Sequence, residues 1–350
     1  MAIERLGDYA YQAVQKHFKK STKLEAEVLA DTDPEPLHQM RVGMRRLRTA
    51  LMVFESAIDL PKTVSEARIK KFAQQLGAVR DIDVMQAKLV ERYRPDLNRK
   101  EQKQLDKLLG DMKKQRKQVF AAVENLLEGK RYHDFKQGFQ DWLDAPKFFA
   151  IAAMPIQSVV PDLLLPLISD LLLHPGWLAG AELEQSSVDE KAIAMTLKNH
   201  SDSLHDLRKQ IKRVRYQTEF FTQFYGSDFA LQVEDFQNIQ EVLGEIQDYS
   251  ILKDFMANSL HANWHQDLPI LAQRLEHEQT SLWKTWKPIQ QRYLDLEFRA
   301  KLRSIVLKVN SQQVNSQQGD WQETPNDVAV ESEQTVESKQ AIESEQSAQS

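Results

Sequence analysis

Residues 37–48 read Leu37-His38-Gln39-Met40-Arg41-Val42-Gly43-Met44-Arg45-Arg46-Leu47-Arg48. The same pattern returns 167 residues later as Leu204-His205-Asp206-Leu207-Arg208-Lys209-Gln210-Ile211-Lys212-Arg213-Val214-Arg215. Each copy is followed, 43 residues after its histidine, by the aspartate of a second shared string. These strings are Leu76-Gly77-Ala78-Val79-Arg80-Asp81 and Leu243-Gly244-Glu245-Ile246-Gln247-Asp248. An offset that is held through two separate segments predicts one helical unit used twice.

Both copies place their cations on one face of a helix. At about 100° per residue, the basic groups fall within a narrow sector that lies beside a stripe of apolar side chains. In the first copy these groups are His38, Arg41, Arg45 and Arg48, and in the second they are His205, Arg208, Lys212 and Arg215. Further cations lie elsewhere on these helices and on the first helix of the chain: Arg46, Lys209, Arg213, Lys16, Lys19 and Lys20.

Two interpretations of this basic stripe are open. Like charges at i,i+3 and i,i+4 spacing repel, so the arrangement is costly unless something neutralises it. The cations could belong to a solvated face and pair with acids on neighbouring helices, or they could bind an anionic ligand. The available acids include Asp81, Asp83, Glu241, Glu245 and Asp248. The repetition of the same angular pattern favours an anion site.

Phosphate is the anion that these side chains suit best. A guanidinium meets two phosphate oxygens at once, and an ammonium acts as a point charge. A linear polyphosphate carries closely spaced charges and no bases to be read, so a row of cations along a helix would cradle it. His38 and His205 could hydrogen-bond the ligand or become cations beside it, although a buried structural histidine is the alternative. Asp81 and Asp248 are expected to support a histidine or an arginine by salt bridges.

Composition predicts a helical protein without disulfides. The chain has 350 residues, 41% hydrophobic content and no cysteine, which excludes thiolate zinc sites and fits the cytosol. The net charge of −5 is unevenly distributed along the chain, because residues 311–350 carry eight acids and one base. We expect this Ser/Gln/Glu-rich tail to be disordered. We see no secretory signal, and we expect the apolar stretch 159–173 to be too short and too interrupted to span a membrane. A cytoplasmic protein is expected.

Helical spacing predicts an all-α chain. We expect helices over residues 4–30, 35–56, 64–92 and 98–127, and then short helices and loops over 132–187, where prolines are frequent. The second unit should contain helices from 188 to 225, 229 to 258 and 268 to 309, the last interrupted near Pro288. Phosphate loops, nucleophile elbows and dinucleotide fingerprints are missing from the sequence, and no metal site or cofactor is expected. The aromatic residues at 216–225 suit a core better than a base-stacking platform.

The chain resembles the conserved histidine α-helical domain family, CHAD. Both copies match the family's His-x-x-Arg-x-x-x-(Arg/Lys)-(Arg/Lys)-x-Arg pattern and its Leu-Gly-x-x-x-Asp string. The resemblance covers residues 1–305, with repeat one at about 1–130, a connector at 131–187 and repeat two at 188–305. It is weakest over 168–200, where a counterpart of the lysine-bearing first helix is hard to find. It implies two helical bundles related by a pseudo-twofold axis, whose basic helices line a central channel that binds inorganic polyphosphate without catalysis.

Three classes of function follow from these observations. The leading expectation is non-catalytic polyphosphate binding in the cytoplasm, with an association with polyphosphate granules left open. A hydrolase of polyphosphate or triphosphate is the second class, but it would need carboxylates clustered near the cations to hold a metal. The third class is a nucleic-acid-binding protein, against which the near-neutral charge of residues 1–310 argues. We expect neither a specific nucleic acid nor a membrane as a partner.

Overall fold

The computed structural model describes residues 5–181, 190–260 and 263–310. Within these ranges the chain is all-α, and its extended pairing is limited to two isolated bridges. The expected all-α class is therefore confirmed, and the pseudo-twofold axis and the central channel stay predictions. The chain divides into two compact units, one ending at Ile156 and the other beginning at Gln157, and each is described by itself. The expected disordered tail, 311–350, lies outside the described residues.

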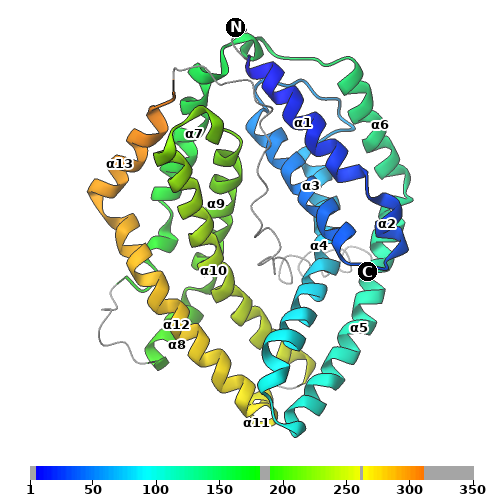
Figure 1. Cartoon of the computed structure of the whole chain (residues 1–350), viewed down its shortest axis with the longest axis vertical. Helices are drawn as coiled ribbons and strands as arrows, with labels where there is room; N and C mark the ends of the chain where they lie inside the picture. Colours follow the sequence, from blue (N-terminus) through cyan, green and yellow to red (C-terminus); the bar gives the residue numbers. More distant parts are fainter. Residues whose placement is uncertain (1–4, 182–189, 261–262, 311–350) are drawn as a thin grey trace, which may run out of the picture. The chain divides into compact units, whose positions relative to one another are not determined.

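The first unit is built around the first basic helix, α3. This helix packs against α1 on one side and α4 on the other, and α4 in turn packs against α5 (Figure 1). The elements of this unit are α1 (Leu6–Thr22), α2 (Glu25–Ala30), α3 (Glu35–Val53), α4 (Glu66–Lys88), a π-helical turn (Leu89–Tyr93), a 3₁₀ turn (Arg94–Asp96), α5 (Arg99–Leu127), α6 (Lys130–Asp144) and a second 3₁₀ turn (Ala150–Ala153).

The second unit repeats the pairing of a basic helix with a helix that carries the Leu-Gly string. The basic helix α9 packs against α10, and α10 packs against α12. The elements of this unit are α7 (Ile156–Leu172), a 3₁₀ turn (Pro175–Leu178), α8 (Glu190–Asn199), α9 (Ser201–Glu219), a 3₁₀ turn (Thr222–Phe224), α10 (Ser227–Ser259), α11 (Trp264–Asp267), α12 (Pro269–Leu294) and α13 (Leu296–Leu307).

Two glycines permit the close contacts that position the basic helices. A β-carbon on Gly43 of α3 would lie 2.7 Å from the backbone nitrogen of Ser21 on α1. In the second unit the glycine lies instead on the 3₁₀ turn Pro175–Leu178, which packs against α9. A β-carbon on Gly176 would lie 2.6 Å from the carbonyl oxygen of Ser203 on α9. The first basic helix thus packs against a long helix, and the second packs against a short 3₁₀ turn.

Four sequence-based boundaries were wrong. The helix expected from 188 to 225 is divided at His200 into α8 and α9, and α9 ends at Glu219. The helix expected over 4–30 is divided after Thr22 into α1 and α2. Residues 132–187, expected as short helices and loops, contain most of the 15-residue α6 and the 17-residue α7, which includes Pro161 and Pro166. Pro288 lies inside α12, and the break comes at Asp295, whose carboxylate accepts a hydrogen bond from the backbone N–H of Phe298. At Pro161, Pro166 and Pro288, burial and packing outweigh the loss of a backbone hydrogen bond at each proline.

The apolar stretch in the middle of the chain is longer than expected. Residues 156–178 are long and apolar enough, by length and composition alone, to cross a membrane. The same criterion is met by core helices of water-soluble proteins, and Val160, Leu164 and Leu171 of α7 are fully buried. The expectation that this stretch is too short was therefore wrong, and the absence of a membrane partner stays a prediction.

Candidate anion-binding site

The basic face of α3 is largely buried at its N-terminal end. His38 and Arg41 expose 3% and 5% of their surface, whereas Arg45 and Arg48 are half-buried. A buried cation loses its hydration and must be compensated by an opposite charge or by hydrogen bonds. The face is thus built as a partly desolvated strip rather than as an open charged surface.

The pKa of His38 is lowered chiefly by burial, and the positive charges on this face act in the same direction. Burial of the ring lowers it, as do the charges of Arg80, Arg45 and Arg41, in that order of strength, whereas Glu35 acts in the opposite sense. The net result is a pKa of about 4 instead of 6.5. Neither ring nitrogen of His38 is hydrogen-bonded within the described chain. The interpretation of His38 as a satisfied core histidine is therefore not supported.

A second group of cations surrounds His17 on α1. Burial lowers the pKa of His17 to about 3, and the nearby charges of Arg46, Lys16 and Lys20 act in the same direction. The close approach of α1 and α3 at Gly43 explains why side chains from both helices meet here. Most of the predicted residues of the first repeat therefore act on either His38 or His17, whereas Arg48 pairs with Glu66. Lys19 is exposed on α1 and is not among the groups that shift His17.

The second basic face is also buried at its centre. Arg208, Lys212 and Arg215 expose 0%, 6% and 3% of their surface. His205 is half-buried, and the predicted residues Lys209 and Arg213 are exposed. The same helical pattern therefore produces the same desolvated row of cations in both units.

Several of the predicted cations have acidic partners. Arg48 pairs with Glu66 of α4, and the Lys209 Nζ lies 2.7 Å from Asp206 Oδ1. Arg215 Nε donates to Glu219 Oε1 at 2.7 Å, and its Nη1 donates to Gln240 of α10 at 3.2 Å. The interpretation of a basic face that pairs with acids thus holds in part, for Arg48, Lys209 and Arg215. None of these partners belongs to the set of acids that the sequence suggested.

The proposed supporting aspartates lie where the repeat predicts them. Asp81 is half-buried on α4, and Asp248 is 7% exposed on α10, so each belongs to the helix that packs against its basic helix. Their role in orienting a histidine or an arginine stays a prediction. Arg80 and His17 were missed, although Arg80 stands directly before Asp81 in the Leu-Gly string.

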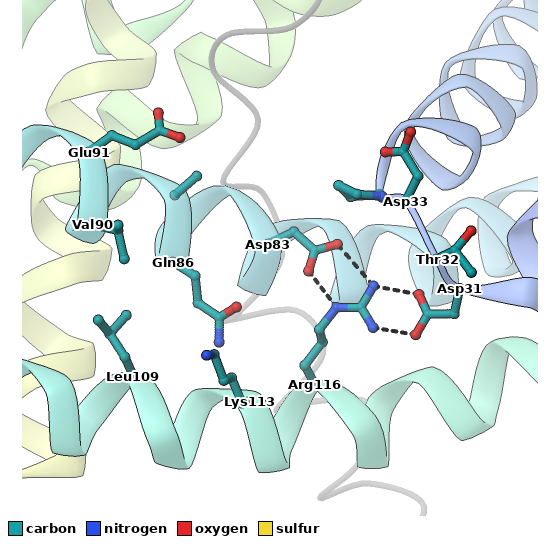
Figure 2. Close-up of a pocket in the computed structure, with 12 residues that line it drawn as sticks. Asp31, Thr32, Asp33, Asp83, Gln86, Val90, Glu91, Leu109, Lys113 and Arg116 are labelled. Atoms are coloured by element: carbon teal, nitrogen blue, oxygen red, sulfur yellow. Dashed lines mark hydrogen bonds and ion pairs between the residues drawn. The ribbon is translucent and has the colours of Figure 1, made fainter.

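Asp83 serves a different purpose from the one the sequence suggested. Arg116 of α5 places its guanidinium between Asp83 of α4 and Asp31, which follows α2 (Figure 2). Its Nη1 and Nη2 atoms donate to Asp31 at 2.6 and 2.7 Å, and its Nε donates to Asp83 at 2.5 Å. Because both carboxylates stabilise the charged guanidinium, the pKa of Arg116 is raised. This cluster ties three segments together and leaves Asp83 engaged away from the basic face.

The pocket beside Arg116 is a poor site for a polyanion. It has a volume of about 450 Å³ and is lined by four acidic side chains and only two basic ones. Since Arg116 is neutralised by two of these acids, the remaining charge of the lining is negative. The acids are Asp31, Asp33, Asp83 and Glu91, and the bases are Lys113 and Arg116. The basic faces of α3 and α9 therefore remain the better candidates for an anionic ligand.

Comparison with known proteins identifies the family and supports the fold. The CHAD domain family model matches residues 12–257. The fold is similar to the crystal structure of the CHAD domain from the plant Ricinus communis, with a TM-score of 0.54 and 22% identity over 90% of this chain and 96% of that one. It is also similar to PptA from Streptomyces chartreusis, with a TM-score of 0.54 and 14% identity over 82% and 99% of the two chains. No curated protein matches the sequence. The chain belongs to the CHAD domain family.

Proposed function

We propose that this CHAD domain protein binds inorganic polyphosphate through the basic faces of α3 and α9, without catalysing a reaction on it. The observation that carries the proposal is the positive potential at His38, where three arginines outweigh one glutamate. An anion placed on this face would offset the repulsion among the cations and would raise the proton affinity of the imidazole. The same row of buried cations on α9 supports a second contact region.

The aromatic side chains near α9 favour polyphosphate over nucleic acid. Single-stranded nucleic acids are held by bases that stack on exposed aromatic rings. Five aromatic residues at the end of α9 and just beyond it expose at most 7% of their surface, and so they serve the core. These residues are Tyr216, Phe220, Phe221, Phe224 and Tyr225. A polyphosphate chain needs no such platform, because its charges are its recognition feature.

Competition at one ionic strength tests the ligand class. The full chain is bound to labelled long-chain polyphosphate, and either unlabelled polyphosphate or duplex DNA of equal charge is added. We expect polyphosphate to compete at a much lower charge concentration than DNA. Equal competition by both would mean that the faces bind polyanions without preference, and it would contradict the proposal.

Release of phosphate tests the non-catalytic role. The protein is incubated with long-chain polyphosphate or triphosphate and Mg²⁺, and free orthophosphate is measured over time. We expect no release above that of a protein-free control. Release that disappears in the Arg41→Gln variant would show that the basic face belongs to a hydrolase instead.

We also propose that the protein acts in the cytoplasm. A tagged copy expressed in phosphate-rich cells should collect where polyphosphate granules form, if the binding seen in solution operates in the cell. A variant with both basic faces weakened, Arg41→Gln with Arg208→Gln, is the matched control. An identical distribution of the two proteins would contradict a granule association that depends on polyphosphate.

A further inference from the structure

The last described residues of the chain lie beside the end of the basic helix α9. The backbone N–H of Asn310 donates a hydrogen bond of 2.9 Å to the carbonyl oxygen of Phe224, in the 3₁₀ turn that follows α9. The hydroxyl of Tyr225 donates a second bond, also of 2.9 Å, to the carbonyl oxygen of Val306 near the end of α13. These two contacts place the start of residues 311–350 next to the C-terminal end of α9.

The sequence that starts at this point, here called the acidic tail, is residues 311–350. It contains eight acids and one lysine, which is a net charge of −7 in 40 residues. Because the whole chain carries −5, residues 1–310 carry +2. The excess negative charge of the protein is therefore concentrated in the segment that begins beside α9. Its acids are Asp320, Glu323, Asp327, Glu331, Glu333, Glu337, Glu343 and Glu345.

The acidic tail is long enough to follow the whole basic face of α9. The 19 residues of this helix span about 28 Å at a rise of about 1.5 Å per residue. A flexible chain of 40 residues has a root-mean-square end-to-end distance of about 35 Å, and it can extend several times further. Because the tail is covalently attached, it meets this face at a high effective concentration, on the order of millimolar.

The basic face of α9 suits a carboxylate as well as a phosphate. Arg208 and Lys212 are buried cations, and a buried cation is stabilised by a negative charge close to it. Arg215 already donates to a carboxylate, that of Glu219, one turn further along the helix. A guanidinium forms the same paired hydrogen bonds with carboxylates and with phosphates. The acids of the tail lie several residues apart, so a polyphosphate presents more charge per length and should displace them.

We infer that the acidic tail is an intramolecular competitor, which occupies the basic face of α9 until polyphosphate displaces it. The inference rests on the proposed function, since it names a second occupant of the same face. Its consequence is selection for long ligands. A long polyphosphate offers enough charge to replace the tail, whereas a short anion competes poorly with a tethered segment.

Two full-length variants with the same change of charge test this competition. One neutralises three acids of the tail, and the other neutralises three exposed acids on helices of the second unit. The affinity for long-chain polyphosphate is measured for both variants and for the wild type at several salt concentrations. The tail variant combines Glu331→Gln, Glu333→Gln and Glu337→Gln, and the control combines Glu190→Gln, Glu234→Gln and Glu297→Gln.

We expect the tail variant to bind polyphosphate about three- to tenfold more tightly than the wild type at low salt, because fewer tail contacts must be broken. Its slope of log affinity against log salt should be steeper, since the ligand then replaces more small counterions and fewer tail carboxylates. The control variant should change little. Equal tightening in the two variants would show that overall charge acts alone, and it would overturn the inference.

A measurement without ligand separates this inference from the proposed function. Backbone NMR signals of residues 311–350 are recorded in the wild type, in Arg208→Gln and in Lys284→Gln, which removes an exposed cation of α12. We expect the tail signals to change in Arg208→Gln but not in Lys284→Gln. High salt should change them in the wild type too, since it screens contacts between carboxylates and cations.

The two measurements fail in different ways. Tail signals that stay the same in Arg208→Gln and at high salt, in a chain that binds polyphosphate, would overturn the inference alone. Tail signals that respond as expected, in a chain that does not bind polyphosphate, would contradict the proposed function and leave the contact between the tail and α9 in place.

Discussion

The buried imidazole of His38 couples the stability of the first unit to pH. The unfolded chain takes up a proton at the ordinary pKa of 6.5, but the folded chain resists protonation until about pH 4. Between these values the unfolded state binds more protons, so stability is present above pH 6.5 and is lost as the pH falls toward 4. We expect acidification from pH 7 to pH 4.5 to cost about 2–2.5 kcal/mol at this residue.

Urea unfolding at these two pH values checks this prediction, with His38→Gln as the comparison. The variant should lose less stability on acidification than the wild type. It will retain some pH dependence, because His17 has a pKa of about 3 and acts with the same sign. An equal loss in both proteins would show that His38 is already accessible to protons in the folded state.

Individual arginines should carry much of the affinity for polyphosphate. Because Arg41 and Arg208 are buried, a reversal to glutamate would risk unfolding, and glutamine is the better replacement. We expect Arg41→Gln or Arg208→Gln to weaken binding by about 1.5–3 kcal/mol, the range for hydrogen bonds to charged groups. Calorimetric titration with long-chain polyphosphate measures the loss, and circular dichroism confirms that the helices remain. Affinity equal to that of the wild type in both variants would remove these residues from the site.

At the scale of elements, the contact between α1 and α3 depends on a missing side chain. Gly43→Ala would place a β-carbon 2.7–2.9 Å from the backbone of Lys20 and Ser21, which cannot yield as a flexible side chain could. We expect this variant to lose about 1–3 kcal/mol of stability through overpacking. Gly110→Ala on α5 is the control, since its β-carbon would meet no atom within 4 Å. It should gain about 0.5–1 kcal/mol from helix propensity.

Thermal unfolding of the two variants distinguishes these effects. A lower midpoint for Gly43→Ala together with a raised midpoint for Gly110→Ala supports the close packing of α1 on α3. Two raised midpoints would mean that the helices can separate at no cost.

Periodicity predicted the helices that carry the candidate site better than it predicted their surroundings. The 3.6-residue spacing of apolar and basic groups identified α3, α4, α9 and α10, because a helix with one buried face leaves that signature in its sequence. It failed for α7, where Pro161 and Pro166 argued for loops but burial of the apolar side chains holds the helix together. Local propensity carries no information about such tertiary packing.

The candidate site was predictable only as far as it lies on one helix. A helical wheel groups His38 with Arg41 and Arg45, because their positions are fixed by one backbone. It cannot show that Arg80 of α4 acts on His38, or that Arg46 meets Lys16 and Lys20 around His17, because these neighbours depend on how helices pack. Glu66 lies on α4, so its pairing with Arg48 also depends on how helices pack. Glu219 lies four residues after Arg215 on the same helix, and this local pairing was missed. One glycine, Gly43, was the available clue to the α1–α3 contact.

At the scale of the whole molecule, the duplication places two basic faces in one chain. A ligand that reaches both faces binds the second at a high effective concentration, since the two are tethered covalently. Triphosphate can occupy one face at a time, whereas a long polyphosphate has charges to offer to both. Long chains should therefore bind about 10²-fold more tightly than triphosphate, or more, at one ionic strength. Weakening either face, by Arg41→Gln or Arg208→Gln, should reduce this ratio.

Salt dependence of the affinity for long-chain polyphosphate tests the central claim most directly. Titrations of the full chain across a range of salt concentrations yield the slope of log affinity against log salt, which counts the ligand charges neutralised by the protein. A steep slope of several units is expected, together with binding that is much tighter than that of triphosphate at every salt concentration. A flat slope, or equal affinity for triphosphate and long chains, would contradict the claim that the basic faces of α3 and α9 bind polyphosphate.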